Sequence, residues 1–148
     1  MLKLKSSIFY FLIIFSLIGC QTNNHTLKEP SFTKISTTNH DQHLSNQIKE
    51  YLASDKNLSM INAVNAGKDV IVTIDIPHIK RFKLATIRKK LEKDIKEEFN
   101  LNNVRVSTDQ KIIIELDKLE NRIERSEMTA EEIKSEVDRI IKLSKEET

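Results

Sequence analysis

The first twenty residues constrain this chain most, because they decide which residues remain to fold. Lys3 and Lys5 precede an almost unbroken apolar run from Ile8 to Ile18, and Cys20 follows two residues later. A positive start, a short apolar stretch and a small residue before the cleavage point are typical of a secretory signal peptide. The run is shorter than the roughly 18–20 residues that span a bilayer. We therefore predict that residues 1–19 are removed and take no part in the fold.

The last four residues of this leader segment match a lipobox, the signal for lipid attachment to a cysteine: Leu17, Ile18, Gly19 and Cys20. In this chemistry a diacylglyceryl group is transferred to the cysteine thiol, and the small Gly19 lets the processing peptidase approach the backbone. Cys20, carrying acyl chains such as palmitate, then becomes the N-terminus. Two acyl chains on one residue give stable anchoring. We expect this lipid to hold the mature chain on the outer face of the cytoplasmic membrane.

Cys20 is also the only cysteine, so the mature domain has no thiol for a disulfide, a zinc cluster or thiol catalysis. Removal of Lys3 and Lys5 leaves 22 basic and 22 acidic residues, so the mature chain has no net charge. It keeps too few aromatic side chains to stack nucleic-acid bases, and we expect no nucleic-acid partner. These aromatic residues are Phe32, Tyr51, Phe82 and Phe99.

The mature chain divides into three parts. Residues 20–40 comprise the lipidated cysteine and a polar segment with scattered apolar residues, which predicts a flexible tether. Residues 41–125 have periodic apolar positions and form the predicted domain, and residues 126–148 form a charged C-terminal helical extension.

Hydrophobic spacing predicts the elements of the domain. A first helix carries Leu44, Ile48, Tyr51 and Leu52, and the runs 60–65 and 70–76 around Gly67 predict a hairpin. Residues 82–99 predict a basic helix with apolar positions at Leu84, Ile87, Leu91, Ile95 and Phe99. A short strand, 104–106, precedes a helix that Thr108 or Asp109 caps, although Ile112–Ile114 also suits a strand. Thr129–Glu132 is a capping box for a final helix.

This order is α-β-β-α-β-α plus a C-terminal helix, an α+β class. We predict a small three-stranded sheet with helices packed on one face. A crossover from the 70–76 strand through the basic helix to the 104–106 strand favours a parallel pair.

These features together resemble the YhcN/YlaJ family of sporulation lipoproteins. The resemblance is carried by the lipobox, the polar segment, the strand Val70–Ile74, the basic helix and the segment Asn103–Asp109. The YlaJ-like branch is more similar, through Lys80-Arg81-Phe82 before the basic helix and Val106–Lys111 after it. The resemblance covers residues 41–125 and the signal.

The resemblance implies an endospore-forming bacterium, expression in the forespore, and residence at the spore inner membrane with a role in germination or outgrowth. The family has no established catalytic residues to carry over. We therefore expect a non-enzymatic protein, without a cofactor, that contacts the membrane through the lipid on Cys20 and binds a membrane or protein partner.

The basic segment, residues 80–96, has a local charge of +6, whereas residues 115–148 have a local charge of −4. Near an anionic membrane each basic residue contributes on the order of 1 kcal/mol. Two interpretations stay open: a surface for anionic lipid or a protein partner, and a solvated helix face. The apolar stripe of the final helix likewise either packs on its own domain or docks another protein. The basic residues are Lys80, Arg81, Lys83, Arg88, Lys89, Lys90, Lys93 and Lys96.

The histidines do not predict a metal site or a catalytic site. His40 and His43 have a spacing that can share a metal, but they lie at the tether boundary without a supporting carboxylate pair. His78 and Asp75 have no serine on a nucleophile elbow. Two alternatives to the leading hypothesis are a small cell-wall-modifying hydrolase and a general envelope lipoprotein that orients on anionic lipid.

Overall fold

The computed structural model describes residues 29–36, 40–77 and 83–146. The order of elements is α2 (His43–Ala53), β1 (Met60–Ala66), β2 (Asp69–Asp75), α3 (Leu84–Glu98), β3 (Asn103–Ser107), α4 (Gln110–Glu124) and α5 (Ala130–Glu146). The predicted order and the α+β class are confirmed. Ile112–Ile114 lie in α4, where the Asp109 carboxylate accepts the amides of Lys111 and Ile112 as an N-cap.

The three strands form one sheet in the order β1-β2-β3. β1 and β2 are the predicted hairpin, and Gly67 at its turn has φ +60, a conformation that glycine adopts without steric cost. β3 is parallel to β2, as the crossover predicts.

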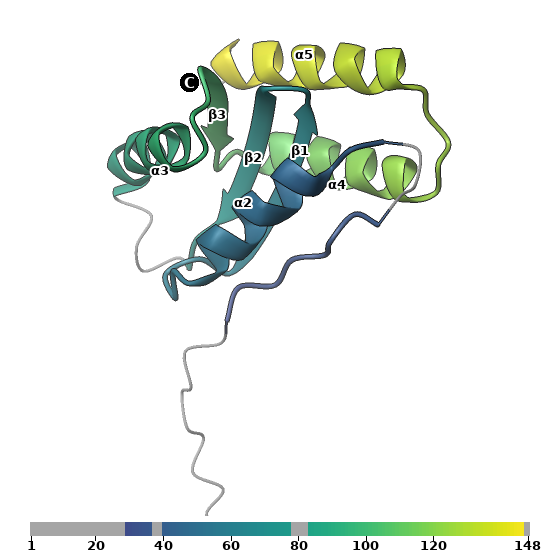
Figure 1. Ribbon diagram of the computed structural model, residues 1–148. Helices are drawn as coiled ribbons and strands as arrows, with labels where there is room; N and C mark the ends of the chain where they lie inside the picture. The colour runs from purple at the N-terminus through teal and green to yellow at the C-terminus, as the bar shows by residue number, and fades with distance from the viewer. Residues whose placement is uncertain (1–28, 37–39, 78–82, 147–148) are drawn as a thin grey trace, which may run out of the picture.

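The prediction that helices cover one face of the sheet is wrong, because helices cover both faces (Figure 1). α2 and α3 pack on one face through Ile48, Leu91 and Ile95. α4 and α5 pack on the other, where Val64 and Ile71 point. The physical reason lies in the strands: five consecutive residues of β2 are buried, and a continuous apolar run suits a strand that is covered on both sides.

The prediction of a flexible tether over residues 20–40 is wrong for residues 29–36, which we call the strap. The strap runs alongside α2 (Figure 1), and its Ser31 forms a parallel bridge with Met60 of β1. Ile35 is 4% exposed in the core that α4 and α5 form with the sheet, and Phe32 packs against the opposite core. An extended segment buries apolar residues one at a time, so it needs no periodicity. Residues 20–28 lie outside the described residues.

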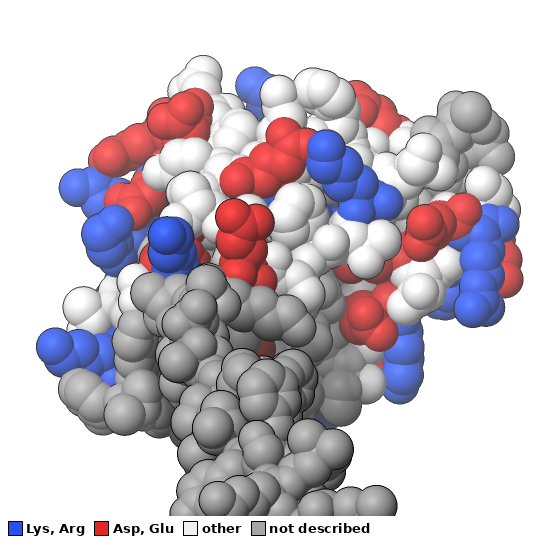
Figure 2. Space-filling model, turned by 90° about the horizontal axis from the view of Figure 1, so that it is seen from below, with Lys and Arg blue, Asp and Glu red and all other residues white. Residues whose placement is uncertain are grey.

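The surface carries both signs of charge. On the face that Figure 2 shows, Lys and Arg side chains lie among Asp and Glu side chains. Arg139 of α5 binds Glu115 of α4 at 2.7 Å and Glu136 of its own helix at 2.8 Å. These two partners raise the pKa of Arg139.

The predicted capping box at the start of α5 is present and yields a prediction on pH dependence. Glu132 Oε2 accepts the Thr129 amide at 2.7 Å, which lowers the pKa of Glu132. A lowered pKa means that Glu132 stabilises the fold above its unfolded pKa, near 4.5, and that this contribution is lost as the pH falls through the folded pKa. Glu132→Gln should therefore lower Tm at neutral pH and leave it unchanged at strongly acidic pH, as followed by circular dichroism.

The matched control is Glu131→Gln, which changes a neighbouring carboxylate in the same helical turn outside the capping box. It should cause a smaller pH-dependent loss, because it keeps the bond to Thr129. Equal destabilisation by Glu132→Gln at acidic and neutral pH would contradict the assignment.

Candidate functional site

The outer edge of β1 is closed by three different groups. The Ile61 amide donates to the carbonyl of Ser31 in the strap at 3.0 Å, and the Ala63 amide donates to Glu120 Oε1 on α4 at 2.8 Å. The Asn65 amide donates to the Gln42 side chain at 3.2 Å. Free amides at an edge strand are templates for pairing with another chain. Strap, α4 and the start of α2 therefore complete the sheet where a fourth strand would otherwise bind.

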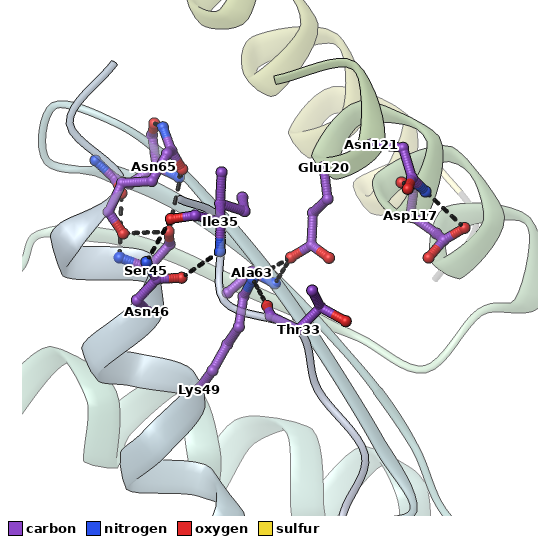
Figure 3. A network of polar contacts seen from close by, with 11 residues as sticks. Thr33, Ile35, Ser45, Asn46, Lys49, Ala63, Asn65, Asp117, Glu120 and Asn121 are labelled. Atoms are coloured by element: carbon purple, nitrogen blue, oxygen red, sulfur yellow. Dashed lines mark hydrogen bonds and ion pairs between the residues drawn. The ribbon is translucent and has the colours of Figure 1, made fainter. Parts of the chain in front are cut away.

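A buried ion pair lies at the centre of this edge (Figure 3). Lys49 Nζ on α2 lies 2.6 Å from Glu120 Oε1, and the Lys49 side chain is fully buried. Burial raises the pKa of Glu120, while the Lys49 ammonium and the Ala63 amide oppose the rise. The pair joins the two helix layers around the edge of the sheet.

The same lysine and its neighbour on α2 hold the strap. Lys49 Nζ donates to the Thr33 carbonyl at 2.7 Å. Asn46 accepts the Ile35 amide at 2.9 Å and donates to the Ile35 carbonyl at 2.8 Å, as a strand partner would (Figure 3). The strap is thus fixed by backbone contacts that do not depend on most of its side chains.

The opposite edge of the sheet uses a similar arrangement. The Val106 amide of β3 donates to Glu92 Oε1 of α3 at 2.9 Å. Arg105 lies 3.5 Å from the same oxygen and donates to the Ser144 carbonyl of α5 at 2.8 Å. At both edges, a carboxylate that is paired with a cation accepts an edge amide.

A groove of about 430 Å³ lies between the loop after α2 and the helix α3. Leu58, Ile76, Ile87 and Leu91 give it an apolar lining, and Lys83 and Lys90 lie with Asp55 among its polar residues. Ser59, the residue after Leu58, accepts the Ser31 amide at 3.0 Å. The groove therefore begins one residue away from the point where the strap joins the domain.

The comparison with known families identifies the chain. The family model of the sporulation lipoprotein YhcN/YlaJ matches residues 18–142. The chain belongs to this family. The match extends beyond the segment that carries the resemblance in the sequence, because it includes most of α5. No curated protein and no solved structure matches the chain significantly.

Several residues that the sequence singles out lie outside the described residues of this family member. These are the residues of the predicted lipobox, Leu17, Ile18, Gly19 and Cys20, and the basic residues Lys80 and Arg81. The family match includes Ile18, Gly19 and Cys20 with the folded domain. Among the helices of the described ranges, none is both long and apolar enough to cross a membrane.

The remaining basic residues lie on or beside α3, but their charge is partly compensated there. α3 contains five basic and four acidic residues. Lys90 pairs with Asp94, which raises the pKa of Lys90, and Lys93 lies 3.6 Å from Glu97. Lys83 and Lys89 are exposed, whereas Arg88 and Lys96 are half-buried. The described part of the segment is therefore a mixed helix face with a small positive excess.

The apolar stripe of α5 packs on its own domain, so the docking interpretation of that stripe is wrong. Ile133, Val137, Ile140 and Ile141 are buried against α4 and the sheet. His40 lies 2.6 Å from the Met128 carbonyl, so it joins the α4–α5 loop to the start of the domain. Over residues 29–36, 40–77 and 83–146, no three His, Cys, Asp or Glu residues lie close enough together to hold a metal ion.

The buried ion pair supports a prediction on stability. Glu120→Gln keeps an acceptor for the Ala63 amide but leaves the Lys49 ammonium buried without a counter-charge, which costs about 3 kcal/mol of unfolding free energy. Urea denaturation measures this loss. Arg139→Gln, which removes two ion pairs at the surface, should cost less, about 1 kcal/mol.

A double variant separates the unpaired charge from general disruption. Lys49→Met with Glu120→Gln removes the unpaired ammonium and should be more stable than Glu120→Gln alone. If Glu120→Gln costs no more than Arg139→Gln, the ion pair does not hold the edge of the sheet.

Proposed function

We propose that this sporulation lipoprotein is a non-enzymatic protein of the spore inner membrane, anchored through lipid on Cys20, that supports germination or outgrowth by binding a membrane or protein partner. The observation that carries the proposal is the family match, which begins at residue 18 and therefore includes the predicted lipidation site together with the folded domain.

The polar network at the edge of β1 binds the protein's own backbone. Lys49, Glu120, Gln42 and Asn46 each bind a backbone group of the strap or of β1. These side chains hold the strap in place at the edge of β1. The same network ties the domain to the part of the chain that leads to the membrane.

Replacement of Cys20 tests the anchor and its purpose. Cys20→Ser removes the thiol that accepts the diacylglyceryl group, so the protein should move from the membrane fraction of purified spores to the soluble fraction. Germination and outgrowth should then be slowed as strongly as in a strain without the gene. Immunoblots of the fractions and the loss of optical density during germination measure the two effects.

Asn24→Ala, a change in the polar segment that keeps the cysteine, is the control and should behave as the unchanged protein. Equal membrane retention of Cys20→Ser would contradict lipid anchoring. Normal germination and outgrowth of the deletion strain under every trigger would contradict the supporting role. Expression outside sporulation would favour the general envelope lipoprotein.

A further inference from the structure

We infer that the end of the domain at which the strap begins, here called the exit end, faces the bilayer. The groove between the loop after α2 and α3 then lies in the phospholipid headgroup layer. This inference rests on the proposed lipidation of Cys20. The membrane-facing surface is then this end of the molecule, and not the exposed face of α3.

The chain leaves the domain at the point where the strap begins. Pro30 is buried and Ser31 is bonded on both sides, its amide to Ser59 and its carbonyl to the Ile61 amide, each at 3.0 Å. Lys49 and Asn46 hold the strap further along. The exit point is therefore fixed at the start of β1.

The length of chain between this exit point and the lipid limits how far the domain can lie from the membrane. Nine residues lie between Cys20 and Pro30, and a fully extended chain over these ten Cα-to-Cα steps spans at most about 36 Å. β1 alone carries the hairpin turn about 20 Å away from the exit point. The exit end can therefore lie no more than about 36 Å from the lipid, whereas the hairpin turn can lie about 20 Å farther away.

The exit end combines an apolar groove with lysine side chains. The groove has an apolar lining with the exposed Lys83 and Lys90 among its polar residues, and Met60 beside the strap is 39% exposed. Lysines place their apolar stems along such a lining and their ammonium groups at the polar boundary. This combination suits the boundary between headgroups and acyl chains. On the part of this face that the grey residues leave visible, Lys and Arg side chains lie among Asp and Glu side chains (Figure 2).

The test uses the full lipidated protein in vesicles of phosphatidylglycerol and phosphatidylcholine that is brominated near the headgroup. Because lipidation consumes the Cys20 thiol, one added cysteine is the only site for a fluorescent label. Lys56→Cys places the label in the loop beside the groove, and Lys68→Cys places it at the hairpin turn; both lysines are exposed. Bromine should quench the label at position 56 at least about twofold more than at position 68, given the ~20 Å between the two ends of the strand.

A second pair of variants asks whether the groove is responsible. Ile87→Glu puts a carboxylate into the groove and should reduce quenching at position 56 towards the level at position 68. Ile114→Glu, at an exposed isoleucine of α4, should leave it unchanged. Circular dichroism checks that each variant is folded.

The outcomes separate this inference from the proposed function. Equal quenching at positions 56 and 68, or no effect of a folded Ile87→Glu, would overturn the membrane-facing groove while the anchor stands. If the unchanged protein carries no lipid by mass spectrometry, the proposed anchor itself is wrong.

Discussion

The contact between Lys49 and Glu120 is the interaction on which most of this structure depends. Lys49 comes from the layer formed by α2 and α3, Glu120 from the layer formed by α4 and α5, and they meet at the edge of the sheet between those layers. Their remaining bonds hold the Ala63 amide and the Thr33 carbonyl. A buried ion pair needs further hydrogen bonds to offset desolvation, and the backbone supplies them here. One pair therefore fixes both helix layers, the edge strand and the strap.

Closure of both edges matters more for this protein than for a freely diffusing one. Lipid anchoring concentrates copies in a plane, and exposed strand edges pair between copies. Glu120 at β1 and Glu92 at β3 each occupy an edge amide, and each is paired with a cation, Lys49 or Arg105. A carboxylate in this position cannot continue a strand ladder.

The element order, the hairpin, the parallel crossover and the caps of α4 and α5 were predictable, because each depends on local spacing or on a short motif. The two-sided packing was not predicted, although the uninterrupted run of β2 signals it. The first helix shows why the edge was not predicted: Tyr51, one of the apolar positions that predict this helix, is 38% exposed, whereas Lys49 is fully buried. Lys49 and Glu120 lie among the apolar positions of their helices, which is the sequence signal for a buried pair. The contacts to the strap involve backbone groups, which the spacing of apolar residues does not reveal.

The strap changes what membrane attachment implies for the domain. A free segment from residue 20 to residue 40 would let the domain rotate and present any face to the bilayer. Because residues 29–36 are held on the domain, the chain that leads to Cys20 leaves the domain at the start of β1. In the orientation we infer, a few bonds from α2 side chains to the backbone of the strap act in place of net charge, which is zero over residues 20–148. The polar residues that close the sheet thus also determine which surface lies near the membrane.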